Sequence, residues 1–223
     1  MISLQTASLN AGQRAMVDAC PTVCVAPLTA HEPLSEPGRR WVMAGDGLYL
    51  EARSLAVHVM HRVVAIASAY GDAKAFQRTI NGRVPQSLLN ELIALAVAAG
   101  ENETAALIHW NPDAASYVLS TPDIISSGAA HVTYRDESKD ELLVIDFHSH
   151  GHLPGFFSDT DDESDLSRVG PYFSLVAGNC QSIETLKVCT RVCLSPYLVN
   201  CSQSHPSSEA TQHESPSAPR ELD

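Results

Sequence analysis

The stretch that most constrains the fold is LLVIDFHSHGHLPGFFSDTDDESD, which spans residues 142–165. Its first six residues are an almost continuous apolar run, as in a strand that is buried on both faces of a sheet. Three histidines follow at once, and a Pro-Gly turn and a dense acidic run come after them. Ser158 is a favourable N-cap, and acidic side chains after it suit the first turn of a helix. The stretch therefore predicts a buried strand that leads through a polar loop into a capped helix.

The rest of the chain alternates between helical and extended patterns. A wide apolar stripe over 84–100 predicts a helix, with Pro85 in its first turn and Gly100 at its end. Short apolar segments predict further strands at 103–111, 115–120, 129–136, 171–179 and 186–194. This alternation predicts an α/β layered fold, with a mixed central sheet and flanking helices.

The N-terminal part differs in pattern, and we expect an α+β extension over 1–84. The segment 41–53 predicts a hairpin around Asp46-Gly47. Residues 54–71 are largely apolar and predict a buried helix, on which His58 and His61 would lie on one face. No third ligand lies close to that pair in sequence, so we expect packing or partner contact there rather than metal binding.

Composition limits the classes of function. The formal net charge of −12 argues against direct binding to nucleic acid or to an anionic membrane. The chain has no apolar run of about 18 residues and no signal-peptide pattern, so a cytoplasmic protein is expected. In that compartment the six cysteines are expected to be free thiols. The polar segment 201–223 is expected to be a disordered tail.

The histidines and the acidic helix can be combined into one site. His148 and His150 are two residues apart in an extended segment, so both imidazoles can reach one ion. Ser158 and Asp161 are three residues apart and share one helical face. Two imidazoles and a carboxylate, with a fourth position left to water, make up a catalytic zinc site. The alternative is a polar loop followed by an ordinary capped helix; His152 is interpreted as a residue at the rim.

The complete spacing favours the metal site. The string His148-x-His150-x7-Ser158-x2-Asp161, placed after a buried strand, resembles the motif of the JAMM (JAB1/MPN/Mov34) metalloprotease family. The resemblance covers about 85–200, so we expect a JAMM/MPN domain there. Most family members have Pro directly after the second histidine, whereas this chain has Gly151. That departure changes the loop and removes no ligand.

The family also has a glutamate on an early strand, just after the first helix of the core. Glu103 lies in that context, at the start of the segment ETAALIHW. Alternation from Glu103 places Ala105 and later apolar residues on its face of the strand. Glu101 is the nearby alternative and Glu51 is a more distant one.

The resemblance implies a zinc-dependent peptidase or isopeptidase. Zn²⁺ would be held by His148, His150 and Asp161 and would activate a water molecule. Glu103 would act as the general base, and Ser158 would donate a hydrogen bond to the oxyanion. The implied substrate is a protein with a ubiquitin-like or sulfur-carrier-like tail.

Within the family, HSHG…PGFFS…DD, with GLYLE before it and PYFSLVAGN after it, is most similar to bacterial members of the PRTRC system. That likeness extends back to about residue 41. Such members are encoded beside ThiF-like and other partition- or repair-associated genes, so it implies those proteins as partners. The alternative function is a non-catalytic MPN scaffold that assembles a PRTRC-type complex. The motif is complete in this chain, which favours the enzyme.

Overall fold

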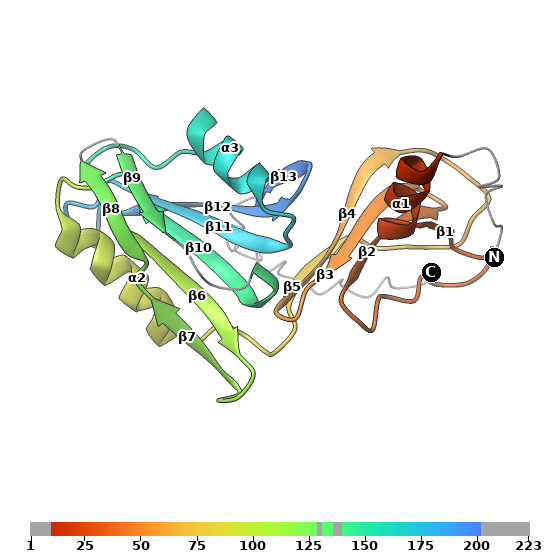
Figure 1. The fold of residues 1–223 in the computed structure, drawn as a ribbon, viewed down its shortest axis with the longest axis horizontal. Helices are drawn as coiled ribbons and strands as arrows, with labels where there is room; N and C mark the ends of the chain where they lie inside the picture. Colours follow the sequence, from red (N-terminus) through yellow and green to blue (C-terminus); the bar gives the residue numbers. More distant parts are fainter. Residues whose placement is uncertain (1–9, 129–130, 136–139, 202–223) are drawn as a thin grey trace, which may run out of the picture.

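Two β-sheets pack side by side and carry the helices of the chain on their outer surfaces (Figure 1). The computed structural model describes residues 10–128, 131–135 and 140–201. The N-terminal sheet follows chain order: β1 (Thr22–Cys24), β2 (Gly38–Ala44), β3 (Gly47–Arg53), β4 (Val57–Ala65) and β5 (Phe76–Thr79). β1 pairs with β2 in parallel, and the other neighbours are antiparallel.

The C-terminal sheet has six strands in the order β13-β12-β11-β10-β6-β7. Their bounds are β6 (Ala105–Asn111), β7 (Ser116–Ser120), β10 (Leu143–Ser149), β11 (Tyr172–Gly178), β12 (Lys187–Leu194) and β13 (Tyr197–Asn200). Only β10 and β11 pair in parallel, and helix α3 (Asp159–Ser167) connects them. β8 (Asp123–Gly128) and β9 (His131–Arg135) form a separate hairpin, and a 3-10 turn, Asp140–Leu142, precedes β10.

The six-stranded sheet has one apolar face and one mixed face. Helix α2 (Gln86–Ala99) buries Leu92 and Ala96 in the main core, together with Ile108 of β6 and Phe147 of β10. The N-terminal sheet contributes to this same core, for example through Val57. Figure 1 shows α3 on the side of the sheet opposite α2. The polar groups of β10 therefore face α3, whereas the other face completes a core that both sheets share.

Contacts at the edge of the six-stranded sheet fasten the two sheets together. Trp41 of β2 packs edge-on against Tyr197 of β13, with ring centroids 6.3 Å apart. The guanidinium of Arg39 donates to the backbone carbonyls of Ser195 and Val169. The N-terminal sheet is thus packed on the C-terminal one through both apolar and polar contacts.

The predicted helix over 54–71 is wrong. β4 forms within that segment, and the first four residues of the strand, 57–60, are all buried. Burial on both faces removes the period-2 pattern that identifies a strand, while the β-branched valines favour extended structure. His58 and His61 therefore do not share a face: His58 is fully buried beside Glu51, and His61 lies toward Tyr197.

Most other predicted elements are confirmed. The structure has the hairpin of β2 and β3, helix α2, helix α3 and the strands β6, β7, β10, β11 and β12 of the C-terminal sheet. The predicted α/β fold with a mixed sheet and flanking helices is correct and is consistent with a JAB-like fold. Helix α1 (Ala11–Ala19), β1, β5, β8 and β13 were not predicted. α1 buries no side chain, so it adds no residue to the core. Its local sequence signal is the capping box between Asn10 and Gln13.

Three further expectations concern the whole chain. All six cysteines are free thiols, as predicted. No helix in the described ranges is both long enough and apolar enough to cross a membrane. The predicted disordered tail over 201–223 falls, apart from Cys201, outside the described residues.

Candidate metal centre

The ends of three strands fix the two histidines. His148 is the penultimate residue of β10, and His150 follows the strand directly. The backbone N–H of Ser149 donates to the Thr104 carbonyl beside β6 over 2.9 Å, and the N–H of His150 donates to the Ala177 carbonyl of β11 over 2.7 Å. The loop is thus pinned to strands on both sides, which leaves little freedom in how the imidazoles are placed.

His148, His150 and Asp161 come together as the sequence predicts. Their ligand atoms all lie within 4.8 Å of one another. The Nε2 atoms of the two histidines are 3.3 Å apart, and His148 Nε2 is 3.2 Å from Asp161 Oδ1. Two ligands at about 2.0–2.1 Å from a tetrahedral zinc ion are separated by about 3.3 Å. Both separations fit that value, so the three side chains suit a zinc ion.

A capping box places Asp161. The hydroxyl of Ser158 accepts from the backbone N–H of Asp161, and the backbone N–H of Ser158 donates to Asp161 Oδ2 over 2.7 Å. The Ser158 hydroxyl also donates to Oδ2, over 2.7 Å. The oxygen that faces His148 is the other one, Oδ1. Helix capping therefore turns this carboxylate toward the histidines.

Helix α3 is anchored to the sheet by a residue that sequence reasoning missed. Arg191 of β12 is almost fully buried and pairs with Asp162 and Asp165 of the helix. Tyr172 of β11 donates to Asp165 Oδ1 over 2.8 Å, which adds a second attachment. No local spacing links Arg191 to a helix more than twenty residues earlier, so the sequence offers no signal for it.

The second nitrogen of His150 also has a partner. His150 Nδ1 lies 3.1 Å from the Pro154 carbonyl, which only accepts hydrogen bonds. Nδ1 must therefore carry the hydrogen, and Nε2 keeps its lone pair for the centre of the cluster. The ring of Phe156 packs edge-on against His150, with centroids 4.9 Å apart. This arrangement of an oriented and shielded imidazole is typical of a metal ligand.

The electrostatics of the cluster are those of a site for a cation. Burial alone would lower the pKa of His148, but the hydrogen bond and charge of Asp161 outweigh burial and raise it. Burial would raise the pKa of Asp161, but the hydrogen bond and charge of His148 lower it well below its usual range. Burial and the neighbouring His148 lower the pKa of His150. A carboxylate and a neutral imidazole are the ligand forms that a metal ion requires.

Glu103 lies beside this cluster. Its backbone is buried just before β6, and the residue is 7 % exposed. His148 pairs with Ala105, and Ser149 bonds to Thr104, so the same register extended by one residue places Glu103 opposite His150. Alternation puts Glu103 on the face that carries the histidines. Its charge also contributes to raising the pKa of His148.

The two alternative glutamates lie elsewhere. The side chain of Glu101 is 82 % exposed and pairs loosely with His152, at 3.8 Å. Glu51 is fully buried in the N-terminal sheet and bonds to His58 and Arg40. Position therefore favours Glu103, and His152 lies at the rim with Glu101.

Gly151 has a structural reason to replace the proline of most family members. Its φ is +53°, a left-handed conformation that proline cannot adopt. A Cβ at this position would lie 2.4 Å from the Glu101 carbonyl oxygen. The loop thus packs against the backbone at the start of β6, next to Glu103.

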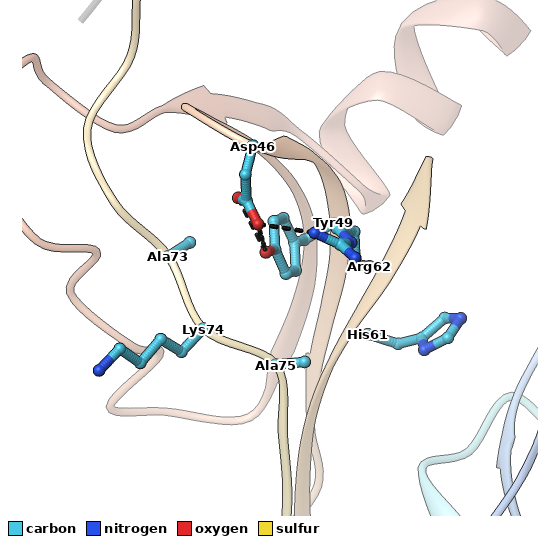
Figure 2. Close-up of a pocket in the computed structure, with 7 residues that line it drawn as sticks. All are labelled: Asp46, Tyr49, His61, Arg62, Ala73, Lys74 and Ala75. Atoms are coloured by element: carbon cyan, nitrogen blue, oxygen red, sulfur yellow. Dashed lines mark hydrogen bonds and ion pairs between the residues drawn. The ribbon is translucent and has the colours of Figure 1, made fainter. Parts of the chain in front are cut away.

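Two hollows lie on the described surface. One, of about 550 Å³, is lined by Phe156, Phe157, Asp162, Arg191 and Leu198, among others, and its Phe156 also packs against His150. The other, of about 480 Å³, lies in the N-terminal sheet around Asp46, Tyr49 and Arg62 (Figure 2). Figure 2 shows Tyr49 and Arg62 turned toward Asp46, to which both donate hydrogen bonds, whereas the side chains of Lys74 and His61 point away from each other.

Two family models match the chain, one over the part that holds the N-terminal sheet and one over the part that holds the C-terminal sheet. Residues 85–191 match a model described as prokaryotic homologs of the JAB domain. Residues 10–77 match a model for a domain of unknown function (DUF2016). No curated protein matches the chain significantly. The first match supports the JAB/MPN family for the C-terminal part, and the closer likeness to PRTRC system protein A stays a prediction.

Proposed function

We propose that the C-terminal part of this chain is a zinc-dependent metallopeptidase that hydrolyses a peptide or isopeptide bond. The observation that carries the proposal is the separation of the donor atoms: 3.3 Å between the two Nε2 atoms and 3.2 Å from His148 to Asp161. A zinc ion requires donor atoms that converge in this way. The match to the JAB domain supports the same conclusion.

The residues around the cluster have separate roles in this mechanism. Zinc, when bound by His148, His150 and Asp161, supplies a Lewis acid that lowers the pKa of water and polarises the scissile carbonyl. Glu103 takes the proton from the attacking water and delivers it to the leaving nitrogen. The Ser158 hydroxyl, which donates to Asp161 in this structure, would donate a hydrogen bond to the oxyanion.

The substrate is a protein with a ubiquitin-like or sulfur-carrier-like tail. The hollow lined by Phe156, Phe157 and Leu198 supports this, because it offers apolar surface to a bound chain and because Phe156 also packs against His150. ThiF-like and other PRTRC-system proteins are the proposed partners that supply the tagged substrate. A non-catalytic scaffold that assembles such a complex is the second candidate, since some JAB-domain proteins lack activity.

Exchange of Glu103 for glutamine separates the enzyme from the scaffold. Glu103→Gln keeps the size of the side chain and removes the base, so turnover should fall by about 10²–10⁴-fold. Zinc content should stay unchanged because Glu103 is not a ligand. Glu101→Gln is the matched control, and its exposed side chain should make it neutral.

The assay is cleavage of a ubiquitin-like fusion by the zinc-loaded full chain. Full turnover in Glu103→Gln with zinc retained would contradict the mechanism. If the wild type binds zinc and cleaves none of a panel of fusions, the scaffold function is supported instead.

A further inference from the structure

The N-terminal sheet holds a second cluster of charged groups, far from the mechanism above. Glu51 and His58 are both fully buried, and His58 Nε2 lies 2.9 Å from Glu51 Oε1. Glu51 also accepts from Arg40 Nε over 2.8 Å and from the backbone N–H of Leu34 over 2.8 Å. Arg40 therefore balances the charge of Glu51, and no charge of the carboxylate is left over.

Two more arginines converge on the other side of His58. Arg53, His58 and Arg78 lie side by side across β3, β4 and β5. Arg53 reaches His58 Nδ1 at 3.3 Å and Arg78 reaches it at 3.2 Å. A guanidinium has donors only, so Nδ1 must be the acceptor and His58 is neutral. A single nitrogen lone pair cannot satisfy two guanidinium groups.

These two arginines have no counter-charge among the described residues. Neither forms an ion pair with a described carboxylate, and the buried Nε of Arg53 donates to no described group. The cluster thus carries about two surplus positive charges. Residues 39–83 as a whole contain seven of the fourteen Lys and Arg residues of the chain but only three of its twenty-six Asp and Glu residues. Half of the basic residues of this acidic chain therefore lie in residues 39–83, which include most of the N-terminal sheet.

The arginines are held in place before any ligand arrives. The Arg78 guanidinium lies over the ring of Phe76, 4.8 Å from its centroid. Phe76 in turn packs edge-on against His58, also at 4.8 Å. Arg78 is exposed and Arg53 is half-buried, so the pair is open to solvent on the side of β5. Fixed donors of this kind bind an anion without a further loss of side-chain freedom.

We propose that Arg53 and Arg78 form a binding site for a phosphate group, held between the two guanidinium forks and supported by His58 and Phe76. A phosphate monoester carries a charge of about −1.5 to −2 at neutral pH, which matches the surplus, whereas a carboxylate carries half of it. The site gives the N-terminal module a ligand, and it does not depend on the proposed hydrolase.

Calorimetric titration of the full chain at constant ionic strength tests the site. The probes are inorganic phosphate, adenosine monophosphate and acetate. Wild type should bind phosphate in the millimolar range or tighter and acetate at least about tenfold more weakly. Equal affinities for the two phosphate probes would identify free phosphate as the ligand, and tighter binding of the nucleotide would identify a phosphate ester. Both outcomes support the site.

Two variants complete the test. Arg78→Gln removes an exposed guanidinium and should weaken phosphate binding by about tenfold or more. Arg83→Gln removes an exposed charge from the same module and should change binding less than about twofold. Circular dichroism checks that both variants are folded. No phosphate binding by wild type up to about 20 mM, or equal losses in the two variants, would overturn the proposal.

Discussion

Each half of the chain holds a cluster in which imidazoles face a carboxylate. In the C-terminal half, the ligand atoms of His148, His150 and Asp161 lie within 4.8 Å of one another, and no described Lys or Arg forms an ion pair with Asp161. In the N-terminal half, Arg40 already pairs with Glu51, at 2.8 Å. The same residue types thus form a candidate metal site in one cluster and a structural ion pair in the other. Arg40 of the neighbouring strand β2 makes this difference, because it places a positive charge beside Glu51.

The comparison predicts that Glu51 matters for stability rather than for metal binding. Glu51→Gln leaves Arg40, whose side chain is 19 % exposed, without its counter-charge and the fully buried His58 without its carboxylate partner, so the free energy of unfolding should fall by about 3–5 kcal/mol. Urea denaturation measures this loss. Asp46→Asn is the control, because Asp46 pairs with Arg62 near the surface and should cost at most about 1 kcal/mol. Equal losses in the two variants would contradict the structural role of the Glu51 cluster.

Acid should weaken the N-terminal cluster in a defined range of pH. Burial would raise the pKa of Glu51, but hydrogen bonds from His58, the Leu34 backbone and Arg40 lower it to about 2, from the ordinary value of 4.5. A lowered pKa stabilises the fold above pH 4.5, and this stability is lost as pH falls toward 2. The gap corresponds to about 3 kcal/mol. Denaturation curves from pH 6 to about 2 should therefore differ between wild type and Glu51→Gln, and parallel curves would refute the assignment.

A substitution in the loop after His150 should disturb both folding and metal binding. Gly151→Ala adds a Cβ that would clash with the Glu101 carbonyl, at a φ of +53°. We expect a cost of about 1–3 kcal/mol in unfolding free energy and weaker zinc binding. Gly82→Ala is the matched control, because Gly82 has a φ of +86° and open space around it. If both variants bind zinc as the wild type does, the loop does not position His150.

The smallest predicted effect is the response of zinc affinity to pH. Burial lowers the pKa of His148, but Asp161 outweighs burial and raises it, so His148 keeps its proton to a higher pH than an ordinary histidine. Zinc must displace that proton, and its affinity should fall by about tenfold for each pH unit below that pKa. Competition with a chelator between about pH 8 and pH 6 measures the slope. A constant affinity over this range would show that His148 is not a ligand.

The candidate site could be predicted because its spacing is local. His148 and His150 lie on one extended segment, and Ser158 and Asp161 lie on one helical turn. The cluster around Glu51 was not predicted: Arg40 faces Glu51 across the hairpin of β2 and β3, but His58 meets Glu51 only after β3 and β4 pair. The sequence predicts a helix over 54–71 in place of β4, because burial on both faces of β4 removes the alternation of apolar and polar residues. The pairing of β3 with β4 was therefore not expected. Arg191 was missed for a similar reason: its contact with α3 forms only in the folded sheet.

The most direct test of the account is the zinc content of purified protein, measured by plasma mass spectrometry. Wild type should hold about one zinc ion per chain, and His150→Ala should hold none. His31→Gln should keep its zinc, because His31 belongs to the Glu51 cluster, 2.9 Å from that carboxylate. A wild type without zinc even after zinc is added, or a His150→Ala variant that retains it, would contradict the metal centre.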